Sequence, residues 1–379
     1  MKLQVAALVL LSIIGCKQKE EKENTQKSVN IESSVAMESE KTFFYVGTYT
    51  DGASEGIYKY SLGADGKLAK DKLVAKTESP SFLTFSEDKK YLLAVNELTE
   101  GTVSSFKISQ DSLQFLNKKP SGGMHPCFVV SNEEGFVLTA NYSSGNLGLL
   151  KLKEDGNLTD LLDTHQHKGK GAHERQDGPH AHSVWLEPTQ NDIIEVDLGT
   201  NELWFSEIDA ALKKIKPKSV PNLAFEDGTG PRHMAFNPNG KWAYVYGELN
   251  NTITVLSIGE KGNYKVENTY STLPEDFEGE NTGADIHISS DGKFLYASNR
   301  GHNSIVIYKV NEDGSLNTIG YESVRGDGPR NFSLSPDGSY LLVANQYTDN
   351  IISFKRDTNT GLLTFVDEIE APSPVCILF

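Results

Sequence analysis

The feature that most constrains the fold is a unit that repeats from residue 43 to the end of the chain. Each copy has an alternating apolar run, a turn such as Pro-Asp-Gly, a second β-rich run, an Asn/Gly turn and a third run. No stretch shows helical periodicity. Six copies start at comparable points: Pro80, Pro126, Pro179, Pro231, Gly283 and Pro329. Their spacing, about 45 to 53 residues, is typical of four-stranded propeller blades.

A seventh unit is split between the two ends of the repeat region. Residues 43–75 lack the opening strand, and residues 371–379 resemble that strand and then stop. We therefore predict an all-β, seven-bladed β-propeller whose ring is closed by the C-terminal strand pairing into the first blade. Closure removes the open sheet edges that favour aggregation. An open β-solenoid or two sandwiches would not explain the split unit.

The residues before the repeats predict export and an anchor. A basic start precedes an apolar stretch, residues 3–15, that is short for a membrane span and ends in a lipobox-like sequence, Ile13 to Cys16. We expect a lipoprotein-type signal peptide over residues 1–16, lipidation of Cys16, and a tether over residues 17–42, whose dense charge prevents a core. The expected location is the bacterial cell envelope, in the periplasm or outer membrane. An ordinary secretory signal is the alternative, and a cytoplasmic location follows if the export reading is wrong.

Charge and cysteine content limit the partners. The chain has 52 Asp and Glu against 36 Lys and Arg, a net charge of -16. Nucleic-acid binding needs a basic surface, so we expect no nucleic-acid partner. Contact with a membrane is expected only through the lipid, and the protein is expected to be a monomer. Cys127 and Cys376 would lie two blades apart, which predicts free, buried thiols.

The candidate functional residues occupy two positions of the repeat. In a propeller the first strand lines the central channel, and its start lies beside the end of the second strand. Polar residues recur at these two positions, so we predict that they meet at one mouth of the channel. They are Glu97, His125, Asn141, His180, His182, Arg232, His233, Glu248, Asp285, His287, Asn299, Arg300, Arg330 and Asn345.

These residues do not all need a functional explanation. Asparagines that end strands often bond to turn backbone, so Asn141, Asn299 and Asn345 are explained equally well by structure. Charged groups near an enclosed channel are costly unless they meet a ligand or each other, which favours function for a smaller set. That set is His182, Arg232, Glu248 and Arg300.

A metal site is the rival interpretation of the histidines. The candidates are His173, His180, His182, His233 and His287. No tight ligand spacing such as H-E-x-x-H occurs, and the neighbouring arginines would repel a cation. We therefore expect neither a metal nor a cofactor.

Several ordered motifs carry a family resemblance over everything after the tether. They are residues 45–50 (YVGTYT), 125–127 (HPC), 141–145 (NYSSG), 179–183 (PHAHS), 197–199 (DLG), 230–233 (GPRH), 298–300 (SNR) and 328–330 (GPR). The chain resembles the seven-bladed-propeller lactonases, the 6-phosphogluconolactonase type that includes fungal carboxy-muconate lactonizing enzymes. The resemblance implies hydrolysis of a sugar lactone without metal or cofactor. It maps the catalytic His, Arg, Glu and Arg onto His182, with His180 as the alternative, Arg232, Glu248 and Arg300.

The chemistry of lactone opening agrees with these residue types. Water needs a general base, which His182 or Glu248 would supply. The negative tetrahedral intermediate needs a fixed donor, for which Arg232 is the candidate. A phosphate or carboxylate on the substrate would be held by Arg300 with Arg175 or Arg330. Hydroxyl recognition is expected from Asn141, Asn345 and His287, with His180 as a further substrate-binding residue.

The substrate and the activity have alternatives. A phosphorylated sugar lactone is a cytosolic metabolite, which conflicts with the export signal, so another sugar-acid lactone is the alternative substrate. A lactonizing cycloisomerase acting on a muconate-type diacid would use the same ester bond in reverse. A propeller that has lost catalysis would serve as an envelope-anchored binding module. The complete set of His182, Arg232, Glu248 and Arg300 favours an active enzyme.

Overall fold

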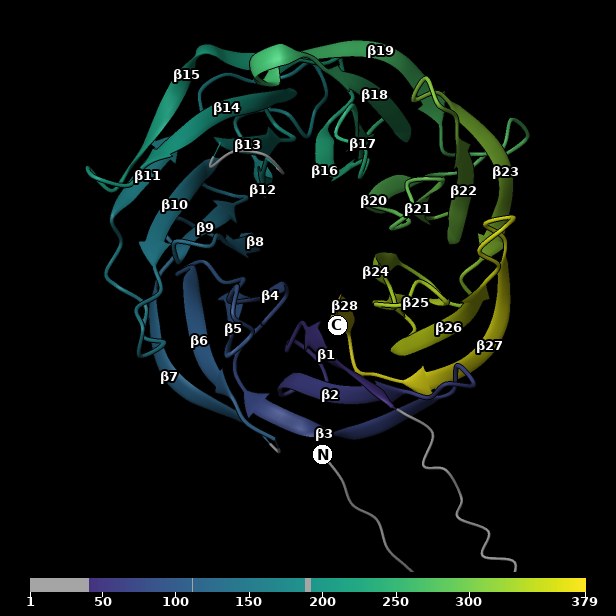
Figure 1. Ribbon diagram of the computed structural model, residues 1–379, viewed down its shortest axis with the longest axis horizontal. Helices are drawn as coiled ribbons and strands as arrows, with labels where there is room; N and C mark the ends of the chain where they lie inside the picture. The colour runs from purple at the N-terminus through teal and green to yellow at the C-terminus, as the bar shows by residue number, and fades with distance from the viewer. Residues whose placement is uncertain (1–40, 111, 188–191) are drawn as a thin grey trace, which may run out of the picture. The chain divides into compact units, whose positions relative to one another are not determined.

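The computed structural model describes residues 41–110, 112–187 and 192–379, and of residue 261 only the backbone. Over these residues the chain forms seven four-stranded antiparallel sheets arranged as the blades of a ring (Figure 1). One short 3-10 helix, η1 (Glu260–Gly262), interrupts the strands. Within the described ranges, no helix has the length and apolar character needed to cross a membrane. The predicted signal peptide, Cys16 and nearly all of the tether lie outside the described residues.

The strands follow one another outward from the centre in each blade. Blade 1 contains β28 (Pro374–Leu378), β1 (Thr42–Thr48), β2 (Gly56–Leu62) and β3 (Leu68–Lys76). Blade 2 contains β4 (Leu83–Phe85), β5 (Tyr91–Asn96), β6 (Thr102–Ile108) and β7 (Leu113–Pro120). Blade 3 contains β8 (Pro126–Ser131), β9 (Phe136–Asn141), β10 (Asn146–Lys151) and β11 (Asp163–Gln166). Blade 4 contains β12 (Ala181–Leu186), β13 (Asp192–Asp197), β14 (Glu202–Asp209) and β15 (Lys214–Ala224).

The remaining blades have the same order. Blade 5 contains β16 (Pro231–Phe236), β17 (Trp242–Gly247), β18 (Thr252–Ile258) and β19 (Tyr264–Ser271). Blade 6 contains β20 (Thr282–Ile288), β21 (Phe294–Arg300), β22 (Ser304–Val310) and β23 (Leu316–Ser323). Blade 7 contains β24 (Pro329–Leu334), β25 (Tyr340–Asn345), β26 (Asn350–Arg356) and β27 (Leu363–Glu370).

The C-terminal strand closes the ring, as the split repeat predicts. β28 pairs antiparallel with β1, with Val46 opposite Ile377 (Figure 1). The backbone N–H of Ile377 also donates to Oδ1 of Asn331 in blade 7, at 2.7 Å. On the other side, the N–H of Leu83 in blade 2 lies 3.4 Å from Sγ of Cys376. The last strand therefore links the first blade to both of its neighbours.

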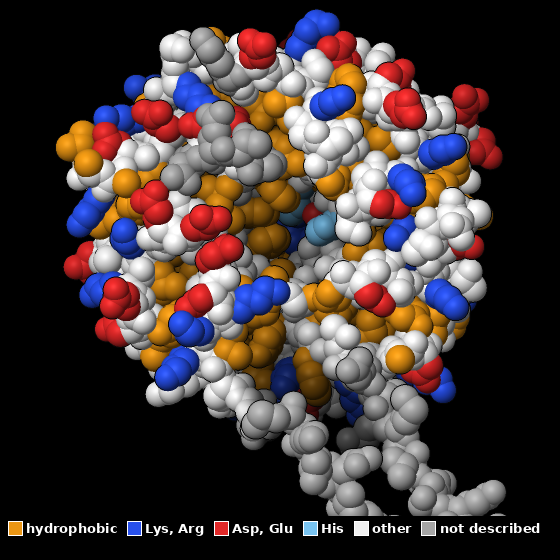
Figure 2. Space-filling model, viewed as in Figure 1, with side chains coloured by type: hydrophobic (Ala, Val, Ile, Leu, Met, Phe, Trp, Pro, Cys, Tyr) orange, Lys and Arg blue, Asp and Glu red, His pale blue; other side chains and the backbone are white. Residues whose placement is uncertain are grey.

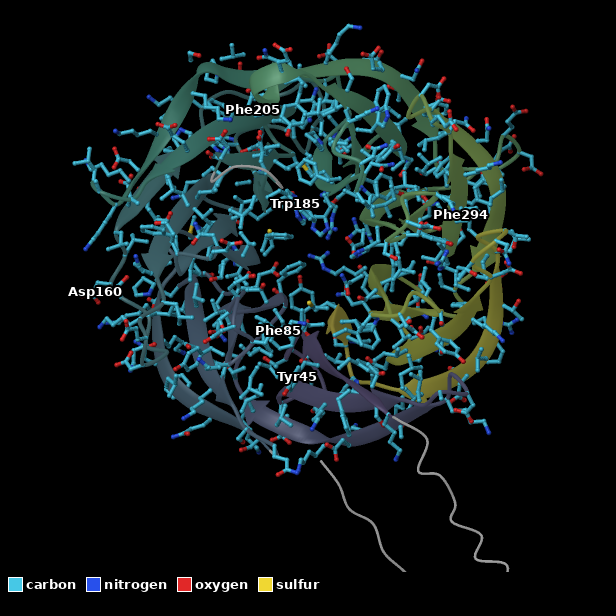
Figure 3. All side chains as sticks on the ribbon, in the orientation of Figure 1. Tyr45, Phe85, Asp160, Trp185, Phe205 and Phe294 are labelled. Carbon is cyan, nitrogen blue, oxygen red and sulfur yellow. The ribbon has the colours of Figure 1, made fainter. Side chains whose placement is uncertain are left out.

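The repeated turns and the apolar runs explain why each unit folds as a blade. In the turns before β21 and β25, Ser289 and Ser335 each donate to the aspartate two residues later, at 2.6 Å. Gly338 follows such an aspartate with φ of 69°, a conformation that glycine adopts readily. The apolar side chains then pack between neighbouring sheets: Phe205 lies in the core between blades 4 and 5, and Phe294 in the core between blades 6 and 7 (Figure 3).

Candidate active site

The predicted polar residues gather where the inner strands begin and the second strands end. Figure 2 shows the ring hollowed at its centre, with basic and histidine side chains visible inside the hollow. A cleft of about 700 Å³ has Arg175, Arg300 and Tyr347 in its lining. A narrower space, with room for about one water, is lined in part by Glu97 and Arg232. The site residues therefore border both a wide cleft and a small, tightly packed space.

Glu248 is the centre of this cluster. It follows β17 directly, and its Oε1 accepts a 2.6 Å hydrogen bond from Nη2 of Arg175. Its Oε2 lies 3.0 Å from Nε of Arg232 and 3.1 Å from Nη2 of Arg300. Arg232 comes from β16 and Arg300 ends β21, so three arginines from separate segments meet on one carboxylate.

The two inner arginines are also fixed by backbone. Nη1 of Arg232 donates to the carbonyl of Ala284, and Nη2 of Arg300 donates to the carbonyl of Gly283, both at 2.6 Å. Among the described residues, the buried Nε atoms of Arg232 and Arg300 have no aligned hydrogen-bond acceptor. The contact of Arg232 Nε with Glu248 is therefore an attraction between charges and not an aligned hydrogen bond. The Nε–H groups of both arginines remain able to donate to a ligand.

The arginines control the charge of the carboxylate. Burial alone raises the pKa of Glu248, but Arg300, Arg232 and Arg175 outweigh it and hold this pKa at about 2. Burial and the neighbouring Arg300 lower the pKa of Arg232 to about 10. At neutral pH the site thus contains an ionised Glu248 surrounded by excess positive charge, an arrangement suited to an anionic group on a ligand.

His182 lies beside this cluster as an uncharged imidazole. It sits in β12, its side chain is 5% exposed, and its Nε2 is 4.0 Å from Oε2 of Glu248. Its Nδ1 is 3.8 Å from Sγ of Cys127, which donates to the carbonyl of His182 at 3.3 Å. Burial and the charge of Arg232 hold the pKa of His182 well below its usual range. A neutral imidazole here can accept a proton.

His180 faces a different neighbour. Its ring stacks on Tyr142, with centroids 4.6 Å apart, and its Nδ1 lies 3.1 Å from the carbonyl oxygen of Tyr142. The hydroxyl of Tyr142 lies 3.4 Å from Nη2 of Arg175, so the stacked pair borders the cluster without touching Glu248. Tyr142 was not predicted from the sequence, although it lies in the NYSSG motif one residue beyond the end of β9. Of the two histidines, the structure places His182 beside the carboxylate.

Asp285 forms a second buried centre that joins three blades. Its Oδ1 lies 2.8 Å from Nδ1 of His233 in blade 5, and its Oδ2 lies 3.0 Å from Nε2 of His287. Nδ2 of Asn331 in blade 7 donates to the same Oδ2 at 2.6 Å. Burial raises the pKa of Asp285, but the two histidines lower it well below its usual range. This centre orients His233 under Arg232, whose Nη1 is 3.4 Å from Nε2 of that histidine.

Arg330 belongs to a third group on the blade 1 and blade 2 side. Its guanidinium lies over the ring of Tyr49, 5.5 Å from the centroid, and the hydroxyl of Tyr49 donates to Oε2 of Glu97 at 2.9 Å. Burial lowers the pKa of Arg330, but the charges of Tyr49 and Glu97 outweigh it and raise this pKa. Tyr49 was not predicted as a site residue, although it lies in the YVGTYT motif, directly after the end of β1.

The two asparagines expected to recognise hydroxyls bond to the segments that lead from the preceding blade into their own. Nδ2 of Asn141 donates to the carbonyl of Ser121 at 3.2 Å, and Nδ2 of Asn345 donates to the carbonyl of Val324 at 2.9 Å. Both side chains are completely buried. Their amides hold the strand-ending turns in place, and their part in hydroxyl recognition stays a prediction.

Cys127 and Cys376 are buried and free, as predicted. Burial raises the pKa of the Cys127 thiol, so it remains protonated at neutral pH. It serves as packing behind His182 and not as a nucleophile.

Known proteins are similar to this chain over most of its length. A 6-phosphogluconolactonase of Bacillus subtilis (strain 168) is 38% identical over 344 residues, covering 88% of this chain and 97% of that protein. The crystal structure of a protein from Lactobacillus plantarum superposes with a TM-score of 0.86 at 34% identity, covering 90% of this chain and 99% of that one. A periplasmic gluconolactonase of Pseudomonas aeruginosa superposes with a TM-score of 0.86 at 31% identity, covering 89% and 98% of the two chains.

The repeat region also matches a family as a whole. Residues 43–379 match the family described as lactonase, 7-bladed β-propeller. The number of blades agrees with that description. The chain belongs to the family of seven-bladed β-propeller lactonases.

Proposed function

We propose that this protein hydrolyses the ester ring of a sugar-acid lactone with a base-activated water. The observation that carries the proposal is the convergence of Arg175, Arg232 and Arg300 on Glu248 beside a neutral His182. The names of its relatives in Bacillus subtilis and Pseudomonas aeruginosa, a 6-phosphogluconolactonase and a gluconolactonase, support the same class of reaction.

In this mechanism His182 is the general base. Its depressed pKa keeps it unprotonated at neutral pH, whereas the carboxylate of Glu248 is already engaged by three arginines. His182 takes a proton from water as the water oxygen attacks the lactone carbonyl. The tetrahedral intermediate then breaks its ring C–O bond, and the imidazolium returns the proton to the departing hydroxyl oxygen. The product is the open hydroxy acid.

Arg232 stabilises the negative oxygen of the intermediate. Its guanidinium is held by Ala284 and Glu248, so it needs no reorganisation when charge develops. Glu248 acts by holding Arg232 and Arg300 in position. Removing a comparable fixed donor reduces kcat by about 10²–10³ fold.

The outer residues are proposed to bind the substrate. Arg300 and Arg175 line the wide cleft and would hold an anionic group, and Arg330 faces the inner space from blade 7. His287 and His180 are the proposed partners for sugar hydroxyls. The three arginines can bind either a carboxylate or a phosphate, so an assay must determine the substrate.

The experiment that tests the proposal compares lactones under one set of conditions. The protein is assayed against 6-phosphogluconolactone, gluconolactone and other aldonolactones, with the spontaneous rate subtracted. If only the phosphorylated lactone is hydrolysed, the arginines of the cleft bind its phosphate. If neutral lactones are hydrolysed, the substrate is an unphosphorylated sugar-acid lactone. No turnover of any lactone contradicts the proposal, and a muconate-type diacid tested in parallel would then detect a cycloisomerase.

We also propose that the protein is exported and lipid-anchored through Cys16. The lipobox-like sequence supports this, as does the periplasmic location in the name of the Pseudomonas aeruginosa relative. Cells fed a palmitate analogue should label the wild type and not the Cys16→Ala variant. An unlabelled wild type would contradict the anchor.

A further inference from the structure

A second cluster of histidines and carboxylates lies between blades 3 and 4, outside the Glu248 cluster. His165, in β11, has its Nδ1 2.8 Å from Oε2 of Glu195 in β13. Nε2 of His167 lies 2.6 Å from the same carboxylate oxygen. On the other side of the imidazole, Nδ1 of His167 lies 2.6 Å from Oδ2 of Asp197. His165 in the outer strand and His167 just beyond its end thus face two acids of the neighbouring blade.

The cluster is shielded from water on most sides. The side chains of His167 and Glu195 are 0% exposed, and that of His165 is 14% exposed. The indole of Trp204, in β14, stacks on His167 with centroids 4.8 Å apart and rings inclined by 2°. Of the side chains of His165, His167 and Glu195, only that of His165 reaches solvent.

We propose that this cluster binds a divalent transition metal of the zinc type. One ring nitrogen of His165, one of His167 and an oxygen of Glu195 all lie within 4.8 Å of one another. Two imidazoles and one carboxylate are a ligand set that zinc accepts in tetrahedral sites, with a water in the fourth position. The partly exposed side of His165 is where that water fits. Small movements would replace the direct contacts with bonds of about 2.0–2.2 Å to the metal.

Asp197 supplies the outer contact that such a site needs. A histidine that binds a metal through one nitrogen usually donates its other N–H to a carboxylate, which fixes the ring and its tautomer. His167 has this arrangement, because Asp197 accepts from Nδ1 and leaves Nε2 for the metal. The carboxylate is itself fixed: its Oδ1 accepts from the backbone N–H of His180 at 2.9 Å and of Thr200 at 2.7 Å.

The charge of the cluster suits a cation. Glu195 and Asp197 are completely buried acids beside the two histidines, and Glu202 is a further nearby acid. A bound divalent cation would balance these carboxylates.

The site would also fix a segment of the proposed active site. Residues 167–180 run from His167 to His180, and both ends of the segment bond to Asp197. Between them lies Arg175, which reaches Glu248. Only this consequence rests on the proposed function. The metal site itself stands or falls on binding measurements that do not involve turnover.

The test is the metal content of the full chain, purified without a histidine tag or chelator. Metal is measured by mass spectrometry after dialysis against zinc, and the melting temperature is measured with zinc or with EDTA. The variant is His165→Ala, and the matched control is His302→Ala, whose ring packs on Phe277 and Tyr321. We expect about one zinc per chain in the wild type and control, and about tenfold less in the variant.

A second variant guards against a failure to fold. If His165→Ala does not fold, His165→Asn retains an amide that can donate to Glu195 and lacks the imidazole. Equal zinc in the wild type and His165 variants, or a wild type that neither holds zinc nor melts higher with it, overturns the proposal. The cluster would then be hydrogen-bonded only.

Discussion

His182 differs from an ordinary histidine because it is buried next to Arg232, and this sets a pH prediction. A general base must be unprotonated, and the pKa of His182 lies well below the usual value of about 6.5. Glu248 stays ionised over the same range, with a pKa of about 2. We predict that kcat/KM falls on the acid side only well below pH 6.5, measured in buffers that stabilise the lactone. A half-maximal rate at pH 6.5 would contradict the assignment of His182 as the buried base.

Asp285 is predicted to be a major source of stability, since it accepts hydrogen bonds from three blades. Asp285→Ala leaves His233 and Asn331 without their buried acceptor, and breaking a buried pair of this kind costs about 3–5 kcal/mol. The free energy of unfolding should be measured by urea titration, with the exposed Glu278→Ala as a control that changes it by about 0.5 kcal/mol or less.

The lowered pKa of Asp285 also predicts how the free energy of unfolding depends on pH. The folded pKa of Asp285 is lowered, so its contribution is present above the unfolded pKa of about 3.9 and is lost as pH falls through the folded value. The difference in unfolding free energy between wild type and Asp285→Ala should therefore be constant near neutral pH and shrink below about pH 4. A difference that grows on acidification would contradict this assignment.

At the scale of elements, the turn after β13 supports the segment that leads into β12. A Cβ on Gly199 would lie 1.9 Å from the carbonyl oxygen of Gly178, whereas a Cβ on Gly178 would meet nothing within 4 Å. We predict that Gly199→Ala lowers stability by about 1–3 kcal/mol and also lowers kcat/KM, because the backbone at His180 must shift. Gly178→Ala is the control and should change neither. Equal effects of the two substitutions would disprove this account of the turn.

The sequence predicts the strands better than it predicts the partners of the polar side chains. Each blade is a local meander, so alternation and turn residues identify it, and the split repeat predicts the pairing of β28 with β1. Convergence of Arg232, Glu248 and Arg300 follows from their equivalent places in neighbouring repeats. The contacts of Asp285 with Asn331 and of His167 with Glu195 form between blades. The pattern within one repeat therefore does not predict them. The alternate spacing in His165-x-His167 and Glu195-x-Asp197 is the one local signal that points to the second cluster.

At the scale of the molecule, closure of the ring predicts a large effect of removing one strand. A chain ending at Ala371 loses β28 and exposes the edge of β1 and the neighbours of Ile377. We predict a marked fall in the melting temperature, and partial recovery when a synthetic peptide of residues 372–379 is added. A scrambled peptide is the control. Recovery with both peptides, or no loss on truncation, would contradict closure by this strand.

The central claim is that lactone hydrolysis occurs at the Glu248 cluster with His182 as base. The most direct measurement is kcat/KM of His182→Ala on the best lactone substrate, beside His302→Ala, with both variants shown to be folded by circular dichroism. The account predicts a loss of about 10²–10⁴ fold for His182→Ala and no change for His302→Ala. A His182→Ala enzyme with the activity of the wild type would contradict the central claim.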